Sequence, residues 1–205
     1  MMFKAIGRNG MLLGIFALIT TLVIAGTWLN TRDRIAAQQR AAEERALLEI
    51  VPLDRHDNAM LDDTLPVSNS ELLNLNQEEN IHIARMGGEF VAAIIPVIAP
   101  DGYSGEIRLI VGINADGSVA GTRVIAHRET PGLGDKVELR KSDWILSFDG
   151  HSLTNPKPEQ WTVLKDGGVF DQFTGATITP RAVTNAVYRA LLFFEKNRQQ
   201  LVVEK

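Results

Sequence analysis

An uninterrupted apolar stretch opens the chain. Residues 9–31 carry no charge, and residues 11–29 are almost wholly apolar. A hydrocarbon core of about 30 Å needs roughly 20 helical residues, so this stretch predicts a membrane-spanning helix. Lys4 and Arg8 would also suit a cleaved signal peptide, but the apolar run exceeds the ~7–15 residues of such a peptide, and no small-x-small cleavage site ends it.

The next two segments connect this helix to a folded domain. Residues 31–50 are rich in Ala, Gln, Glu and Arg, which predicts a helix continuing out of the bilayer, and Pro52 follows its end. Residues 51–80 are polar and contain Asp, Pro and a Ser-Asn-Ser run, so we expect loops with a short helix near residues 70–75. The predicted organisation is therefore an N-terminus (1–8), a transmembrane helix (9–31), a helical spacer with a loop-rich connection (32–80) and a folded domain (81–205).

Strand patterns dominate the first half of the folded domain. Residues 89–99 form a nearly continuous Val- and Ile-rich run, which predicts a buried strand. Apolar residues alternate in 107–113, and the turn Asn-Ala-Asp-Gly leads back into 118–126 as a hairpin partner. Further elements are expected later: a helix around 142–148, a strand from Trp161 and an amphipathic helix over 180–198. Strands followed by helices predict an α+β fold with a mainly antiparallel sheet.

The start of the last predicted helix suits an anion. Thr179 is a good N-cap and Pro180 suits the first helical position. The helix then places its apolar residues on one face, namely Val183, Val187, Ala190, Leu191 and Phe194. Thr177 would lie just ahead of unpaired N–H groups and the positive end of the helix dipole, a place suited to a phosphate. Gly175 and Ala176 would let the backbone approach a bulky group.

Composition narrows the chemistry. The chain has 205 residues, a net charge of −4 and no cysteine. The missing cysteine excludes disulfides, thiolate metal sites and iron–sulfur ligation within the chain. No basic stripe suits nucleic acid, and the four His are too widely spaced for a metal site. His127 and Glu129 are interpreted as exposed side chains in preference to a proton-handling pair, and Trp144 and Trp161 as core residues. Any redox chemistry therefore needs a non-thiol cofactor.

Two motifs resemble those of the FMN-binding domain family. Asp171, Thr174, Gly175, Ala176 and Thr177 match the family motif D-x-x-[S/T]-G-A-T, in which the last Thr carries FMN through a phosphoester installed by a flavin transferase. The resemblance therefore implies covalent FMN on Thr177, with Thr174 near the phosphate. Asp171 is either a transferase recognition residue or a turn residue.

The second motif is the E-T-P-G-L-G loop, which borders the flavin in that family. It occurs here at residues 129–134, and it implies contacts to FMN from Glu129, Thr130, Leu133 and Gly134. Leu133 offers an apolar face, and Thr130 offers a hydroxyl or backbone group for a ring heteroatom. The resemblance implies no catalytic side chain and no metal ligand.

The order of membrane helix and motifs resembles the G-subunit family of Rnf/Rsx ion-translocating electron transport complexes. This resemblance implies a redox subunit of a translocase that relays electrons through FMN beside integral membrane and peripheral subunits. It also implies a bacterial inner-membrane protein with one membrane pass, a cytoplasmic N-terminus and a periplasmic FMN-binding domain. The count of basic residues points the other way, because Arg32, Arg34, Arg40 and Arg45 follow the span.

Three other interpretations remain open from the sequence. The chain could be a C-type subunit of a sodium-pumping NADH:quinone reductase, or a membrane-tethered ligand-binding or sensor domain without covalent flavin. Thr177 could also be a hydrolase nucleophile, but no positioned base accompanies it. The chain has no nucleotide-binding Gly-rich loop and no catalytic triad, so we do not expect it to act on a soluble substrate alone.

Overall fold

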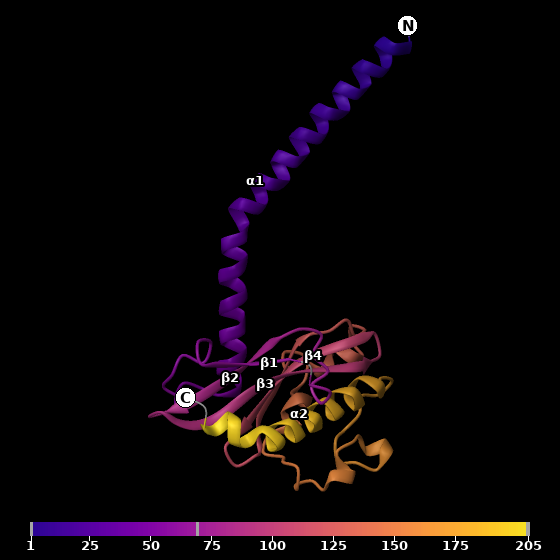
Figure 1. Ribbon diagram of the computed structural model, residues 1–205. Coiled ribbons are helices and arrows are strands. Elements are labelled where there is room, and N and C mark those ends of the chain that lie inside the picture. The colour runs from indigo at the N-terminus through magenta and orange to yellow at the C-terminus, as the bar shows by residue number, and fades with distance from the viewer. Residues whose placement is uncertain (1, 69, 204–205) are drawn as a thin grey trace. The chain divides into compact units, whose positions relative to one another are not determined.

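The N-terminal part of the protein is a long helix. The computed structural model describes residues 2–68 and 70–203, and helix α1 covers Met2–Ile50 (Figure 1). Among these residues, α1 alone contains a stretch long and apolar enough to cross a membrane. Its apolar side chains from Ile6 to Leu29 are exposed, as expected for a surface that faces lipid. Residues up to 43 form one compact unit, and residues from 44 onward form a second.

The second unit contains one five-stranded antiparallel sheet. Its strands follow chain order, β1 (Thr64–Val67), β2 (Glu79–Met86), β3 (Glu89–Gly102), β4 (Gly105–Asn114) and β5 (Val119–Ala126). The predicted α+β fold and the strands predicted over 89–99, 107–113 and 118–126 are confirmed. Strand β1 lies within the segment predicted to be loop-rich, and it pairs with β2 at the sheet edge. The start of the FMN-binding domain at residue 81 stays a prediction.

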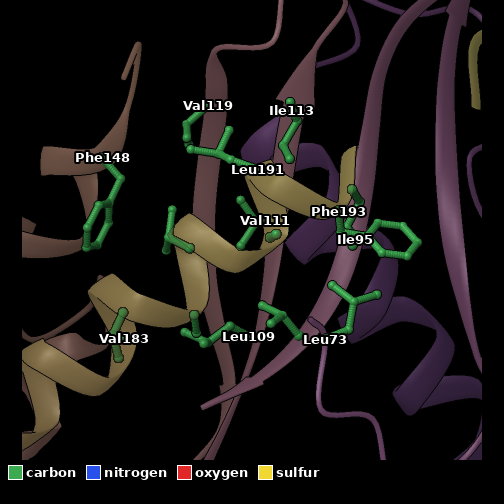
Figure 2. Packing of buried hydrophobic residues seen from close by; sticks show 14 of the residues in the cluster. Leu73, Ile95, Leu109, Val111, Ile113, Val119, Phe148, Val183, Leu191 and Phe193 are labelled. Atoms are coloured by element: carbon green, nitrogen blue, oxygen red, sulfur yellow. The ribbon is translucent and has the colours of Figure 1, made fainter. Parts of the chain in front are cut away.

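Helix α2 (Ile178–Val203) covers one face of the sheet. The predicted apolar face is confirmed, because all five of its residues are buried: Val183, Val187, Ala190, Leu191 and Phe194. Figure 2 shows Leu191 close to Val119 and Ile113 of the sheet. This packing fixes the position of α2, and therefore the position of the residues that lead into it.

The last turn of α1 packs on a second apolar cluster of the sheet. Leu47, Ile50 and Val51 are buried there with Met60, Ala84, Ala92 and Ile94. Arg123 strengthens this contact, because its Nε donates to Oε2 of Glu49 at 2.8 Å and its Nη2 donates to the Glu49 carbonyl at 3.1 Å. Residues 44–51 are therefore part of the folded domain.

Ile50 fits into a notch formed by two paired glycines. Gly112 of β4 lies opposite Gly121 of β5. A Cβ atom on Gly112 would lie 2.2 Å from Cγ2 of Ile50, whereas one on Gly121 would lie 3.4 Å away. Because Ile is β-branched and stiff at χ1, and its Cα lies 3.5 Å from the Gly121 Cβ position, Ile50 has little room to move.

This notch predicts different costs for two otherwise similar substitutions. We expect Gly112→Ala to lower the free energy of unfolding by about 1–3 kcal/mol through overpacking, and the matched control Gly121→Ala to cost clearly less. Urea unfolding of both variants would measure the difference. A double-mutant cycle with Ile50→Ala should show that the cost of Gly112→Ala falls once the Ile side chain is removed. Equal costs for the two glycine variants would contradict this account of the notch.

The short helix predicted near residues 70–75 is wrong. Instead, the Ser70 carbonyl accepts the N–H groups of both Leu73 and Asn74 at 3.1 Å, which makes a single turn. Arg189, distant in the chain, donates from Nε to the neighbouring Leu72 carbonyl at 3.0 Å. Burial lowers the pKa of this Arg189 guanidinium. The segment therefore forms one local turn, and the Leu72 carbonyl pairs with Arg189 where a longer helix would have used it.

The region between β5 and α2 contains short 3₁₀ turns, one of which covers the position of the helix predicted around 142–148. These turns are η1 (Gly134–Val137), η2 (Asp143–Phe148), η3 (Pro158–Gln160) and η4 (Leu164–Asp166). The strand predicted from Trp161 is wrong, because only a single bridge between Val163 and Phe170 forms there. Trp161 is a core residue as predicted, buried against Phe148 and Phe170. Aromatic packing therefore organises this segment together with a few backbone hydrogen bonds, such as that from the Leu164 N–H to the Phe170 carbonyl at 2.8 Å.

Candidate functional site

The two sequence motifs meet at one pocket of about 300 Å³. Its walls come from the β3–β4 hairpin tip, from the 129–134 loop and from the residues that lead into α2. The lining residues are Tyr103, Glu129, Thr130, Leu133, Gly134, Gly175, Ala176, Thr177, Ile178 and Thr179. The volume is at the lower end of the ~300–1,000 Å³ typical of small-molecule sites. The pocket is thus large enough to hold part of a small-molecule ligand.

Thr177 immediately precedes α2. Its carbonyl accepts the Arg181 N–H at 3.3 Å, so the helix starts at Ile178 and Thr177 occupies the N-cap position. The predicted N-cap at Thr179 is therefore wrong. Thr179 lies inside the first turn, and its hydroxyl donates to Oε2 of Glu129 at 2.5 Å. Thr177 is half-buried at the pocket wall, next to the positive end of the helix.

The residues before Thr177 form a tight turn. The Ala176 N–H donates to the Phe173 carbonyl at 3.1 Å, and Gly175 has a φ of +83°. A positive φ at this turn position favours glycine. A Cβ atom on Gly175 would also approach Cδ2 of Leu133 to 3.7 Å. This turn brings the two motifs into close approach across the pocket.

The Glu129 carboxylate ties the three walls together. Only 4% of the residue is exposed. Oε1 accepts the Ser104 N–H of the hairpin tip at 2.9 Å, and Oε2 accepts the Thr179 hydroxyl at 2.5 Å. Gly134 leaves room for this arrangement, because a Cβ atom there would lie 2.7 Å from Oε2 of Glu129 and 2.9 Å from Oγ1 of Thr179. Burying a carboxylate is costly unless hydrogen bonds compensate for the lost water. These two donors provide that compensation.

The rest of the 129–134 loop is held by its own hydrogen bonds. The Leu133 and Gly134 N–H groups both donate to the Thr130 carbonyl at 3.1 Å. Gly132 has a φ of +79°, and its N–H donates to Oδ1 of the buried Asp135 at 2.7 Å. The Leu133 side chain stays 43% exposed at the pocket. The loop therefore presents an apolar side chain from a fixed backbone.

His127 and Glu129 are not the exposed side chains that the sequence indicated. His127 Nδ1 accepts the Glu129 backbone N–H at 3.0 Å, and its Nε2 lies 2.7 Å from Oε1 of Glu138. A neutral ring with an accepting Nδ1 carries its proton on Nε2 and donates it to Glu138. A hydrogen bond from Arg140, and then the one from His127, hold the pKa of Glu138 below its usual range. The imidazole therefore supports the loop backbone from outside the pocket.

Two predicted site residues lie away from the pocket lining. Asp171 and Thr174 are both exposed, and the Asp171 carbonyl accepts the Trp144 Nε1–H at 2.8 Å. Three lining residues were missed in the sequence, namely Tyr103, Ile178 and Thr179. Ile178 and Thr179 directly follow the motif, which was a usable signal. No sequence pattern identified Tyr103, because the residues of a hairpin tip do not indicate which part of the fold they will contact.

The polar groups that line the pocket are neutral hydrogen-bond donors and the Glu129 carboxylate, which already accepts two hydrogen bonds. Neither Lys nor Arg occurs among the described residues that line it. Hydroxyls and backbone N–H groups at the start of α2 are therefore the available partners for an anion. Such a site suits a group that carries little charge.

Known proteins match this chain along nearly its full length. It is 50% identical over 195 residues to the G subunit of the ion-translocating oxidoreductase complex of Pseudomonas aeruginosa, covering 95% of this chain and 91% of the relative. The G subunit of the Vibrio atlanticus complex is 47% identical over 203 residues, covering 99% and 97%. That of Shewanella loihica is 46% identical over 201 residues, covering 98% and 95%. The chain belongs to this G-subunit family.

Two family models agree with that membership. The model of the RnfG N-terminal region matches residues 1–50, which include all of α1. The model of the FMN-binding domain matches residues 102–192, which include the hairpin tip, both motifs and most of α2. In this member of the G-subunit family, all residues lining the pocket fall within the FMN-binding match.

Proposed function

We propose that the chain is a membrane-anchored flavoprotein subunit of an ion-translocating oxidoreductase, with FMN attached through a phosphoester to Thr177. The observation that carries the proposal is the pocket itself, in which Thr177 and the 129–134 loop face one cavity. The FMN-binding match over residues 102–192 supports the cofactor, and the names of the relatives support the complex. The subunit acts in electron transfer as part of a translocase.

The charge of the pocket favours an ester over a free phosphate. A phosphate monoester carries about −1.5 to −2 charge at neutral pH, whereas a diester carries a single negative charge. The described lining residues include no cationic side chain, and one carboxylate lies nearby. Backbone N–H groups and the helix dipole at Thr177 match the smaller charge better.

The remaining pocket residues have separate roles in this proposal. FMN supplies the redox chemistry when bound, and the protein binds and orients it. Leu133 provides an apolar contact for the ring, and Thr130 provides a polar group at its edge. Gly175, Ala176 and Gly134 allow close approach of the backbone. Asp171 and Thr174 lie exposed outside the pocket, where a flavin transferase can contact them during maturation.

Peptide mass spectrometry tests the attachment site directly. Trypsin cleavage after Lys165 and Arg181 releases residues 166–181 as one peptide that contains Thr174, Thr177 and Thr179. We expect this peptide to carry the mass of FMN less one water, with fragmentation assigning it to Thr177. An unmodified peptide from protein matured in its native host would favour the ligand-binding or sensor alternative.

We infer that the partners are integral membrane and peripheral subunits of the same complex. The one candidate span among the described residues supports a single pass through the lipid bilayer. In this proposal the chain lies in the bacterial inner membrane with residues 32–205 in the periplasm, as the resemblance to the G-subunit family implies. A flavin on a periplasmic domain exchanges electrons only with centres that come close to it.

Single cysteines can test this orientation, because the chain has none of its own. We expect Glu159→Cys, at an exposed position of η3, to react with a membrane-impermeant maleimide in intact spheroplasts. Lys4→Cys, on the other side of the span, should react only after lysis. The reverse pattern would place the domain in the cytoplasm, as the count of Arg residues suggests.

A further inference from the structure

Tyr103 lines the pocket from a third part of the chain. It lies at the tip of the β3–β4 hairpin, outside both motifs. The residue is 67% exposed, although tyrosine is a large aromatic residue that gains from burial. Two further apolar side chains of the same pocket, Leu133 and Ile178, are each 43% exposed. The pocket is therefore bordered by apolar side chains that leave part of their surface uncovered.

The hairpin tip has a fixed conformation. A Cβ atom on Gly102 would lie 2.3 Å from the Gly105 carbonyl oxygen and 2.9 Å from Cγ1 of Ile107, so the two strands approach very closely there. Gly105 has a φ of +115°, which other residues rarely adopt. These two glycines turn the chain tightly around Tyr103 and Ser104.

Glu129 connects this tip to the pocket wall. Its Oε1 accepts the Ser104 N–H at 2.9 Å, directly next to Tyr103, while its Oε2 accepts the Thr179 hydroxyl at 2.5 Å. Both carboxylate oxygens are thus used by protein donors. This arrangement makes Glu129 a part of the wall that holds other residues in place.

We propose that Tyr103 packs its ring against the isoalloxazine ring of the flavin, and that Glu129 is the positioning residue that holds it there. The inference rests on the proposed function, because it assumes that FMN occupies the pocket. A flat aromatic ring system covers apolar surface on Tyr103, Leu133 and Ile178 at once, and aromatic pairs gain beyond area burial. Tyr103 shields one side of the flavin and leaves the rest for an electron-transfer partner.

Flavin fluorescence in the native protein tests this contact without any activity measurement. A phenol ring in contact with an isoalloxazine ring quenches its emission, whereas a phenyl ring does not. The full-length flavinylated protein in detergent is compared with Tyr103→Phe and with the matched control Tyr188→Phe. Tyr188 is the other tyrosine of the chain, and it packs on Trp161. Emission is divided by the flavin content measured after denaturation.

We expect Tyr103→Phe to raise native emission per flavin several-fold and Tyr188→Phe to leave it unchanged. Tyr103→Leu should also raise the sensitivity of the emission to iodide, because the ring that covers the flavin is gone. Unchanged native emission in both Tyr103 variants would overturn the inference. Flavin missing from the denatured parent protein would instead overturn the proposed function, so the two failures are distinguishable.

The positioning role of Glu129 has its own measurement. Glu129→Leu keeps the approximate side-chain size but removes both accepting oxygens, so the Ser104 N–H loses its partner and the tip loses its support. With Tyr103 intact, native emission per flavin should rise to a value between those of the parent and Tyr103→Phe. Emission equal to that of the parent would show that Glu129 does not hold Tyr103 on the flavin.

Discussion

Replacing Thr177 by Val is expected to abolish covalent flavin on the protein. Valine keeps the size of the side chain and removes the only atom that can form the ester. The denatured variant should show no flavin fluorescence in a gel under ultraviolet light, while the protein band remains. Persistent fluorescence of the denatured Val variant would contradict the assignment of the site.

The structure indicates why no neighbouring hydroxyl should replace Thr177. The Thr179 hydroxyl donates to the buried Glu129 carboxylate, and Thr174 lies on the exposed side of the turn, away from the pocket lining. Thr177→Ser is the matched control, because it restores a hydroxyl at the same position. We expect this variant to keep its fluorescent band. Loss of flavin in both variants would point to a failure of transferase recognition instead.

Truncation within α1 is expected to have the second large effect. A chain that starts at residue 44 keeps Leu47, Ile50 and Val51 on the sheet, so it should be a soluble, folded domain. A chain that starts at residue 52 exposes the face that they cover. Truncating a buried Leu or Ile to Ala costs about 2–5 kcal/mol, and whole domains are stable by only ~5–15 kcal/mol. Removing all three should therefore unfold the shorter chain at ordinary temperatures.

Thermal unfolding followed by circular dichroism would compare the two truncated chains. A cooperative transition is expected only for the chain that starts at residue 44. Similar melting of both would contradict the structural role of residues 44–51. The longer chain also tests the relay function, because without its anchor it should neither restore activity to the complex nor oxidise NADH alone. Rapid NADH oxidation by this soluble domain would be incompatible with a subunit that works only beside membrane partners.

Local patterns in the sequence were enough to predict much of the fold. The uncharged run of residues 9–31 predicted its helix, and the Val- and Ile-rich run and the Asn-Ala-Asp-Gly turn predicted β3, β4 and β5. The apolar period of α2 predicted its buried face. These features follow from residues that are near one another in the chain, where side-chain period and turn chemistry decide the structure. The two motifs, which are short contiguous segments, contain most residues that line the pocket, whereas their residues Asp171 and Thr174 lie outside it.

Tertiary structure alone decided how the pocket closes. The helix starts at Ile178 and not at Pro180, and the Thr179 hydroxyl in its first turn donates to Glu129, which is distant in the chain. Tyr103 joins the site only because the hairpin tip is tied to the same carboxylate through Ser104. The glycine notch has the same origin, since Gly112 matters only where Ile50 packs. Each of these features depends on a contact between residues that are far apart in the sequence. Such a contact is not encoded by the local sequence around either residue.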